Sequence, residues 1–133
     1  MQIHQTAALY AHVIDRREWG RLADVYAEDG VYDSTRGGKF VGLEQIKQYL
    51  SSSSQPFIHT GSNLVIELEP GADEATGVAK YVVIREGAIE AGDYSDVWVR
   101  TPRGWRIRKR TSTNRALAPL GGTVDTAPRI GPT

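Results

Sequence analysis

The sequence predicts an α+β fold in which three N-terminal helices pack on a strongly curved, mainly antiparallel sheet and enclose an apolar pocket. Up to Leu50 the apolar residues recur three and four positions apart, as in helices that bury one face. Beyond Pro56 they alternate with period two, as in strands. A chain of 133 residues can bury one core but not two, so helices and strands must share it. Such segregation along a small chain favours an antiparallel sheet that is covered on one face.

Three segments carry the helical spacing. The first runs from Ile3 to Arg17, and the second runs from Trp19 to Gly30, where Asp29-Gly30 provides a left-handed stop. The third runs from Leu43 to Leu50 and ends before a serine run and Pro56. We therefore expect three short helices ahead of the sheet.

The alternating segments predict a four-stranded meander. Its strands are centred on residues 64–69, 81–84, 94–99 and 105–108, with turns rich in proline and glycine between them. A short strand at 31–33 and a glycine-rich loop at 36–39 precede the meander. Residues 116–133 follow neither period and are predicted to form a Pro/Gly-rich C-terminal arm or lid, so that a single domain spans residues 1–115.

The composition excludes several classes of function. Sixteen basic residues balance sixteen acidic ones, so there is no positive excess to bind nucleic acid or an anionic membrane. The absence of cysteine excludes disulfides, thiolate metal sites and cysteine nucleophiles. No apolar run approaches the roughly twenty residues of a membrane span, and the N-terminal segment does not resemble a secretion signal. We therefore expect a cytoplasmic protein.

Only three histidines are available for chemistry near neutral pH, namely His4, His12 and His59. By spacing alone, a structural role is the more common one both for His59 at a strand start and for Asp15 at the edge of a helix face. If Asp15 points inward, however, its charge needs a partner, and a histidine is the natural one. An Asp–His pair in an apolar pocket is a general base with a group that orients it. His4 and His12 have no carboxylate at ligand spacing, so no metal site is expected.

Tyrosine and arginine side chains offer donors for the same pocket. Tyr10 and Tyr32 carry phenols, although core packing is the commoner role of such residues. Tyr10 and Asp15 are five residues apart, or about 140° around a helix, so both reach one pocket only if the helix ends or bends near Asp15. Arg110 lies at the end of an alternating arginine series on the last strand, where a bulge would redirect it inward.

Two further expectations concern charges on the meander. The alternation of Arg106, Arg108 and Arg110 is typical of a solvated cationic face. Asp96 and Arg100 are expected to pair across the sheet as a surface interaction of small value.

Several motifs together with Asp15 carry a family resemblance. They are Leu22-Ala23-Asp24-Val25-Tyr26-Ala27-Glu28-Asp29-Gly30-Val31-Tyr32, His59-Thr60-Gly61-Ser62-Asn63-Leu64 and Tyr94-Ser95-Asp96-Val97-Trp98. With them the chain resembles the SnoaL-like branch of the NTF2-like superfamily, nearly throughout and up to about Arg115. That branch includes scytalone dehydratase, bile-acid 7α-dehydratase, hexachlorocyclohexane dehydrochlorinase and the ketosteroid isomerases. The resemblance implies a cone-shaped α+β fold around an apolar pocket.

The resemblance also implies an activity. It suggests a cofactor-independent lyase, either a dehydratase or a dehydrohalogenase, that acts on a hydrophobic cyclic small molecule. The residues implied as catalytic are Asp15, His59, Tyr10 and Arg110. The residues implied to line the substrate site are Tyr32, Tyr26, Ala79, Tyr81 and Tyr94. Tyr10 stands where the dehydrochlorinase has a lysine and the bile-acid enzyme a tyrosine, which favours hydroxyl as the leaving group.

Two alternatives remain open at this point. The same base in an isomerase or polyketide cyclase would move a proton without expelling a group. A non-catalytic ligand-binding protein would instead have Asp15 and His59 too far apart to form a hydrogen bond. By family likeness we expect a homo-oligomer, with a trimer slightly ahead of a dimer, and neither a cofactor, a nucleic acid nor a membrane as partner.

Overall fold

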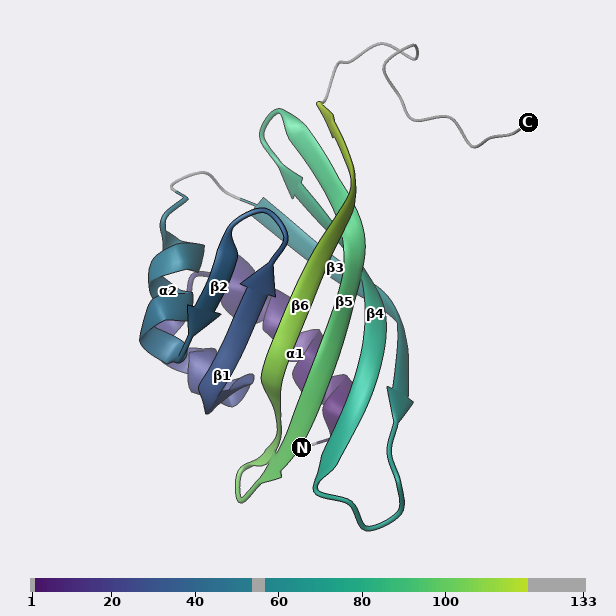
Figure 1. The fold of residues 1–133 in the computed structure, drawn as a ribbon. Coiled ribbons are helices and arrows are strands. Elements are labelled where there is room, and N and C mark those ends of the chain that lie inside the picture. The colour runs from purple at the N-terminus through teal and green to yellow at the C-terminus, as the bar shows by residue number, and fades with distance from the viewer. Residues whose placement is uncertain (1, 54–56, 120–133) are drawn as a thin grey trace, which may run out of the picture.

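The structure, a computed structural model, describes residues 2–53 and 57–119 and has an α+β fold (Figure 1). Its elements follow one another along the chain as α1 (Ile3–Asp15), the 3-10 helix η1 (Trp19–Asp24), β1 (Tyr26–Ser34), β2 (Gly38–Val41), α2 (Leu43–Ser51), β3 (Phe57–Glu67), β4 (Glu74–Arg85), β5 (Ala88–Thr101) and β6 (Gly104–Pro119). Within these residues the fold therefore has two α-helices and one 3-10 helix instead of three α-helices. Neither α-helix combines the length and apolar character needed to cross a membrane.

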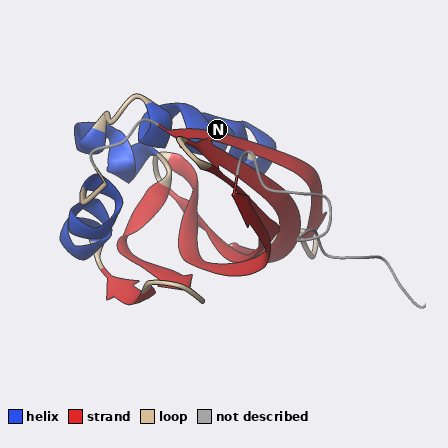
Figure 2. Ribbon diagram, turned by 90° about the horizontal axis from the view of Figure 1, so that it is seen from above, coloured by secondary structure: helices blue, strands red, loops and turns tan. Residues whose placement is uncertain are grey.

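All six strands form one sheet, in the order β2-β1-β6-β5-β4-β3. Neighbouring strands are antiparallel except β1 and β6, which run parallel. The sheet curves strongly, and the helices lie across its concave side (Figure 2). Among the described residues no strand pairs with the outer edge of β2 or of β3, so the sheet that they form is open and does not close into a barrel.

The predicted second helix is wrong beyond η1. This segment becomes a 3-10 helix that ends at Asp24, and β1 begins at Tyr26. Tyr26 pairs with Ile107 of β6 and is almost completely buried, so pairing with a distant strand overrides the local helical spacing. Gly30 lies inside β1 instead of ending a helix, within the register shift between Tyr26 and Val31, and a Cβ there would lie 2.8 Å from the carbonyl oxygen of Ala27.

Other strands extend beyond their predicted bounds. β3 begins at Phe57, so His59 lies inside a strand next to β4. β2 takes up part of the predicted loop at 36–39. β6 continues through residues 116–119 and pairs there with β5, while residues 120–133 of the predicted C-terminal arm lie outside the described residues.

A bulge in β6 decides which arginines face inward. Trp98 pairs with Ile107 and Val97 pairs with Lys109, so Arg108 is an extra residue on β6. Arg108 is exposed, whereas Arg110 is buried on the concave side, as the expected bulge required. The predicted cationic face is wrong, because Arg106 is buried as well and its Nε donates to the carbonyl oxygen of Ala23 at 2.9 Å.

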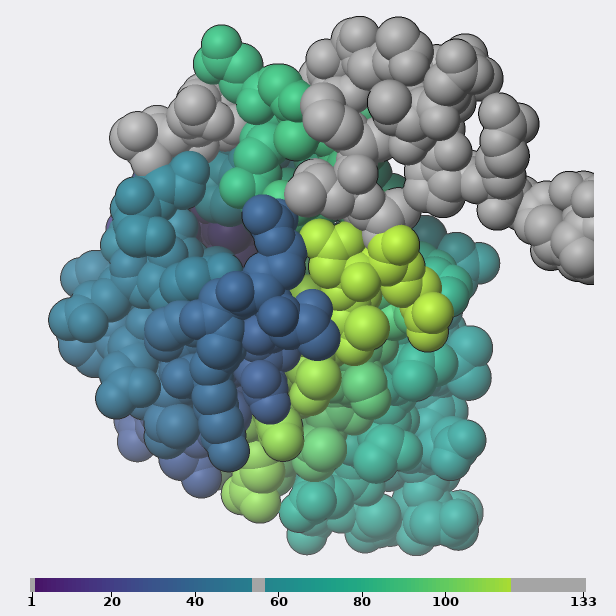
Figure 3. Space-filling view, turned by 45° about the horizontal axis from the view of Figure 1, so that its top comes forward, coloured from purple at the N-terminus to yellow at the C-terminus, as the bar shows by residue number. Residues whose placement is uncertain are grey.

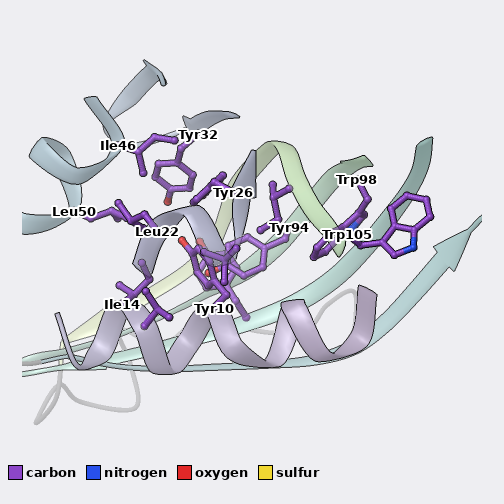
Figure 4. Close-up of a cluster of buried hydrophobic side chains, with 14 of the residues drawn as sticks. Tyr10, Ile14, Leu22, Tyr26, Tyr32, Ile46, Leu50, Tyr94, Trp98 and Trp105 are labelled. Carbon is purple, nitrogen blue, oxygen red and sulfur yellow. The ribbon is translucent and has the colours of Figure 1, made fainter. Parts of the chain in front are cut away.

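Aromatic side chains dominate the core between α1 and the sheet. Figure 4 shows Tyr10 of α1 close to Tyr26 and Tyr94, with Trp98 and Trp105 further along the sheet. The other buried residues of α1 follow the helical spacing and are Ile3, Thr6, Val13 and Ile14. Each fully buried aliphatic side chain contributes about 1.5–3 kcal/mol, so this face holds α1 on the sheet.

Gly92 provides a test of the strand packing. A Cβ at this position would collide with the backbone oxygen of Thr113 and lie 2.9 Å from the ring of Tyr81. We expect Gly92→Ala to lower the free energy of unfolding by about 1–3 kcal/mol, because the backbone of β6 must move. Urea denaturation measures this change. The matched control is Gly61→Ala in β3, where the added carbon meets only the Lys80 oxygen at 3.7 Å. Equal stability of the two variants would contradict the packing described.

Candidate active site

Asp15 and His59 form a two-point contact between α1 and β3. The Nδ1 of His59 lies 2.6 Å from Oδ1 of Asp15, and the backbone N–H of His59 donates to Oδ2 at 2.9 Å. The side chains are 10% exposed for His59 and 21% exposed for Asp15. A carboxylate on Nδ1 favours the tautomer whose proton is on Nδ1, which leaves the lone pair of Nε2 available.

The end of α1 explains how Asp15 reaches this position. Arg17 has a left-handed backbone with φ of 55°. The N–H of Glu18 donates to the carbonyl of Val13, and the N–H of Arg17 donates to that of Ile14. These two bonds are the Schellman arrangement that stops a helix. Since α1 ends at Asp15, the condition for Tyr10 and Asp15 to reach one cavity is met.

Tyr10 is the centre of an aromatic cluster beside His59. Its ring meets the imidazole edge-on with a centroid distance of 6.3 Å, and it meets Tyr26 at 5.9 Å and Tyr94 at 6.1 Å. The ring of Phe57 also meets the imidazole of His59 edge-on, with a centroid distance of 4.9 Å. Edge-to-face contacts of this kind restrict the orientation of the imidazole.

A buried ion pair lies under this cluster. Arg110 donates from Nε to Oδ1 and from Nη2 to Oδ2 of Asp96, both at 2.9 Å, and the side chains are 2% and 0% exposed. The Cζ of Arg110 lies 3.8 Å from the ring centroid of Tyr94 and 4.4 Å from that of Tyr10. Burial alone lowers the pKa of Arg110, but the charge and hydrogen bonds of Asp96 raise it well above its usual value. The guanidinium therefore stays charged inside the protein.

The expected pairing of Asp96 with Arg100 is wrong. Arg100 stacks on Trp105 at 4.6 Å and pairs with the exposed Asp73 at 3.4 Å. Asp96 faces inward because Tyr94 and Trp98, two residues before and two residues after it in β5, lie on the same face of the strand and are buried. That alternation was the sequence signal for a buried acid, and a buried acid requires a cation.

Two cavities meet at His59. The sheet cavity has a volume of about 270 Å³ and lies between the concave face of the sheet and α2. The helix groove has a volume of about 520 Å³ and lies between α1 and β3. His59 and Tyr94 line both. Both also open to solvent, so the predicted enclosure of the pocket is not confirmed.

The predicted site residues divide between these cavities. All four predicted catalytic residues line the helix groove, namely Asp15, His59, Tyr10 and Arg110. Among the predicted substrate-binding residues, Ala79 and Tyr94 line the helix groove, and Tyr32, Tyr81 and Tyr94 line the sheet cavity. Tyr26 lines neither cavity and packs against Tyr10 instead.

Sequence reasoning missed the charged residues of the sheet cavity. Glu90, Arg36 and Arg85 line it, and both arginines pair with the buried Glu90. Glu90 lies two positions before Gly92 and four before Tyr94 on the inward face of β5, so the alternation could have placed it there. Within residues 2–53 and 57–119, no group of His, Cys, Asp or Glu has an arrangement that could hold a metal ion.

A family model described as a SnoaL-like domain matches residues 1–111. The chain belongs to the SnoaL-like family. This SnoaL-like chain is 24% identical over 119 residues to the gamma-hexachlorocyclohexane dehydrochlorinase of Sphingobium indicum, covering 82% of this chain and 76% of that protein. It is 29% identical over 127 residues to an uncharacterised protein of Mycobacterium tuberculosis, covering 85% and 83% of the two chains.

Solved structures share the fold of this SnoaL-like domain. The crystal structure of LinA has a TM-score of 0.77 at 23% identity and covers 91% of this chain and 92% of LinA. A scytalone dehydratase-like protein of Novosphingobium aromaticivorans has a TM-score of 0.78 at 20% identity and covers 98% and 92%. At these identities the likeness extends to the fold. The chemistry must be argued from the residues of the site.

The buried tyrosines predict a loss of stability at alkaline pH. Burial raises the pKa of Tyr10, and it raises the pKa values of Tyr26 and Tyr94 well above the usual value. In the unfolded chain these phenols ionise near pH 10, so the unfolded state releases protons that the folded state keeps. Stability is therefore full below about pH 10 and falls above it. Urea midpoints measured between about pH 9 and 11 should fall, and ultraviolet titration should show fewer ionised tyrosines in the native protein than in urea. Coincident titration curves would be inconsistent with this burial.

The ion pair beneath Tyr10 predicts a large effect on stability. Asp96→Ala leaves the guanidinium of Arg110 buried without its counter-charge, which should lower the free energy of unfolding by about 3–5 kcal/mol. The control is Asp73→Ala, which removes an exposed partner of Arg100 and should change little. Replacing both partners, in Asp96→Leu/Arg110→Met, should be less harmful than Asp96→Ala alone. Urea denaturation distinguishes these cases, and equal effects of the two aspartate substitutions would contradict the prediction.

Proposed function

We propose that this chain is a lyase that removes a proton from carbon in a hydrophobic cyclic molecule and expels hydroxide or halide without a cofactor. The hydrogen bond of 2.6 Å between Asp15 and His59, on the wall that two cavities share, carries this proposal. It combines a base, a group that orients the base, and space for a substrate beside both.

In the proposed reaction, neutral His59 takes the proton through Nε2. The electron pair of the broken C–H bond forms a carbon–carbon double bond, and the leaving group departs with the electrons of its own bond. Asp15 holds the imidazole through Nδ1 and stabilises the imidazolium that forms. When hydroxide leaves, the imidazolium gives it the proton and water is released. When halide leaves, the imidazolium gives its proton to solvent. Both steps restore neutral His59.

Tyr10 and Arg110 are suited to the leaving group. Burial raises the pKa of Tyr10, so its phenol keeps the proton that it would donate. The charge of Arg110 lies against the ring of Tyr10, and both side chains are buried, so this charge acts more strongly than it would at the surface. We propose that the ring of the substrate lies in the sheet cavity and that its leaving group extends past His59 and Tyr94 toward these two residues.

The names of the relatives and the hydrogen bond between Asp15 and His59 favour a lyase over the alternative functions. The names of the dehydrochlorinase and the scytalone dehydratase-like protein describe eliminations. An isomerase or cyclase would use the same base, and product mass separates these reactions from an elimination. A non-catalytic binding protein was expected to keep Asp15 and His59 apart, so their hydrogen bond counts against it.

Substitution of His59 tests the proposal. The protein is incubated with cyclic hydroxylated and halogenated compounds, and mass spectrometry records loss of water or of hydrogen halide. For a compound that is turned over, His59→Ala should reduce kcat by about 10²–10⁴-fold, because the base is gone. Asp15→Asn should also reduce kcat, because the charge that stabilises the imidazolium is lost.

The control variant is Val65→Ala, on the exposed outer face of the same strand, which should keep full activity. Circular dichroism confirms that each variant is folded. Undiminished turnover by folded His59→Ala would contradict the proposed mechanism. Products with the same mass as the substrate would show that the enzyme is an isomerase or a cyclase and not a lyase.

A further inference from the structure

The sheet cavity has His59 at one end and a charged cluster at the other. His59 of β3 pairs directly with Val83 of β4, and Val83 pairs directly with Glu90 of β5. All three line the cavity. Neighbouring strands are about 4.8 Å apart, so the backbones of His59 and Glu90 are separated by roughly 10 Å with an apolar valine between them. This span matches a molecule with one ring between its reacting carbon and a polar group.

Glu90 gathers two arginines at its end of the row. Its Oε1 accepts a hydrogen bond from Nη1 of Arg36 and forms an ion pair with Nη2 of Arg85 at 3.0 Å. The side chain of Glu90 is only 8% exposed, while those of Arg36 and Arg85 are 46% and 33% exposed. Two guanidinium groups on one carboxylate leave one positive charge without compensation at this end of the cavity.

Hydrogen bonds to the side chain of Ser34 hold the turn that carries Arg36. Arg36 lies in the turn between β1 and β2, where Oγ of Ser34 accepts the N–H groups of Arg36 and Gly37, both at 3.2 Å. The hollow beside this turn is visible in Figure 3, between the β1–β2 turn in blue and the β4–β5 hairpin in green. Within the described residues, Nε of Arg85 is buried and has no hydrogen-bond partner, so this guanidinium has donor capacity that Glu90 does not use.

We propose that Arg36 and Arg85, held by Glu90, bind a carboxylate of the substrate, so that the substrate class is a cyclic carboxylic acid with its reacting carbon at His59. This inference deepens the proposed function and rests on it for the word substrate, but the binding of the acid does not depend on turnover. One ligand carboxylate neutralises the excess charge. Arginine is suited to this task because its planar set of N–H donors matches the two oxygens of a carboxylate.

The experiment compares two probes of the same ring and similar shape, cyclohexanecarboxylate, which is charged, and cyclohexanecarboxamide, which is neutral. Dissociation constants are measured by NMR titration for the wild type, Arg36→Met, Arg85→Met and the control Arg108→Met. Arg108 is matched to Arg36, because it is 45% exposed and also pairs with a glutamate, Glu74, but at a site away from the cavity. No turnover is involved in these measurements.

We expect the wild type and Arg108→Met to bind the carboxylate at least about tenfold more tightly than the carboxamide. Arg36→Met and Arg85→Met should each lose most of this preference, with carboxamide binding unchanged. In the wild type, raising the ionic strength from about 0.05 to 0.5 M should weaken the binding of the carboxylate alone, and this readout does not require any variant to fold. His59→Ala should keep the preference even if it loses turnover, so failure of the proposed reaction and failure of this inference are distinguishable.

Three results would overturn the inference. They are equal affinity of the wild type for the two probes, a loss in Arg108→Met as large as that in Arg36→Met, and carboxylate binding weaker than about 10 mM in the wild type.

Discussion

The buried pair of Asp96 and Arg110 constrains the rest of the structure. A carboxylate and a guanidinium that are almost wholly removed from water must face each other, so β5 and β6 must keep the register that places them opposite. That register depends on the bulge at Arg108, which allows Arg110 to face inward on the same side as Ile107. Tyr10 and Tyr94 then stack on the guanidinium, and the wall between the two cavities takes its shape from these rings.

A second polar contact ties the helix to the free edge of the sheet. Asp15 is an acid in the last turn of α1, where the helix dipole disfavours negative charge, and its two bonds to His59 offset this cost. One carboxylate thus holds both the backbone of β3 and the imidazole. Because Asp15 belongs to α1, the orientation of the His59 imidazole depends on how α1 lies across the sheet. The same contact would therefore serve both stability and catalysis.

Local patterns were sufficient for part of this architecture and insufficient for the rest. The spacing of the apolar residues and the length of the chain predicted the α+β class and the meander. The charged segment after Asp15 indicated that the helix could end there, and this end allows Asp15 to contact His59. These patterns failed at Tyr26, because pairing with Ile107 far along the chain outweighs helical spacing. They failed at Asp96 because its partner is set by a bulge on another strand. The cluster around Glu90 joins a turn and two strands, so only the folded sheet brings it together.

The parallel pairing of β1 with β6 determines when the six-stranded sheet can be completed during synthesis. β1 follows η1 near the start of the chain, and among the described strands its neighbours in the sheet are β2 and β6. During synthesis on the ribosome, the β1–β2 pair and the meander of β3 to β5 are therefore both made before β6, the strand that joins them. Contacts between distant segments slow folding, so we expect the pairing of β1 with β6 to be a late step. Since Arg110 arrives with β6, the inward-facing acid of β5 stays without its cation until then.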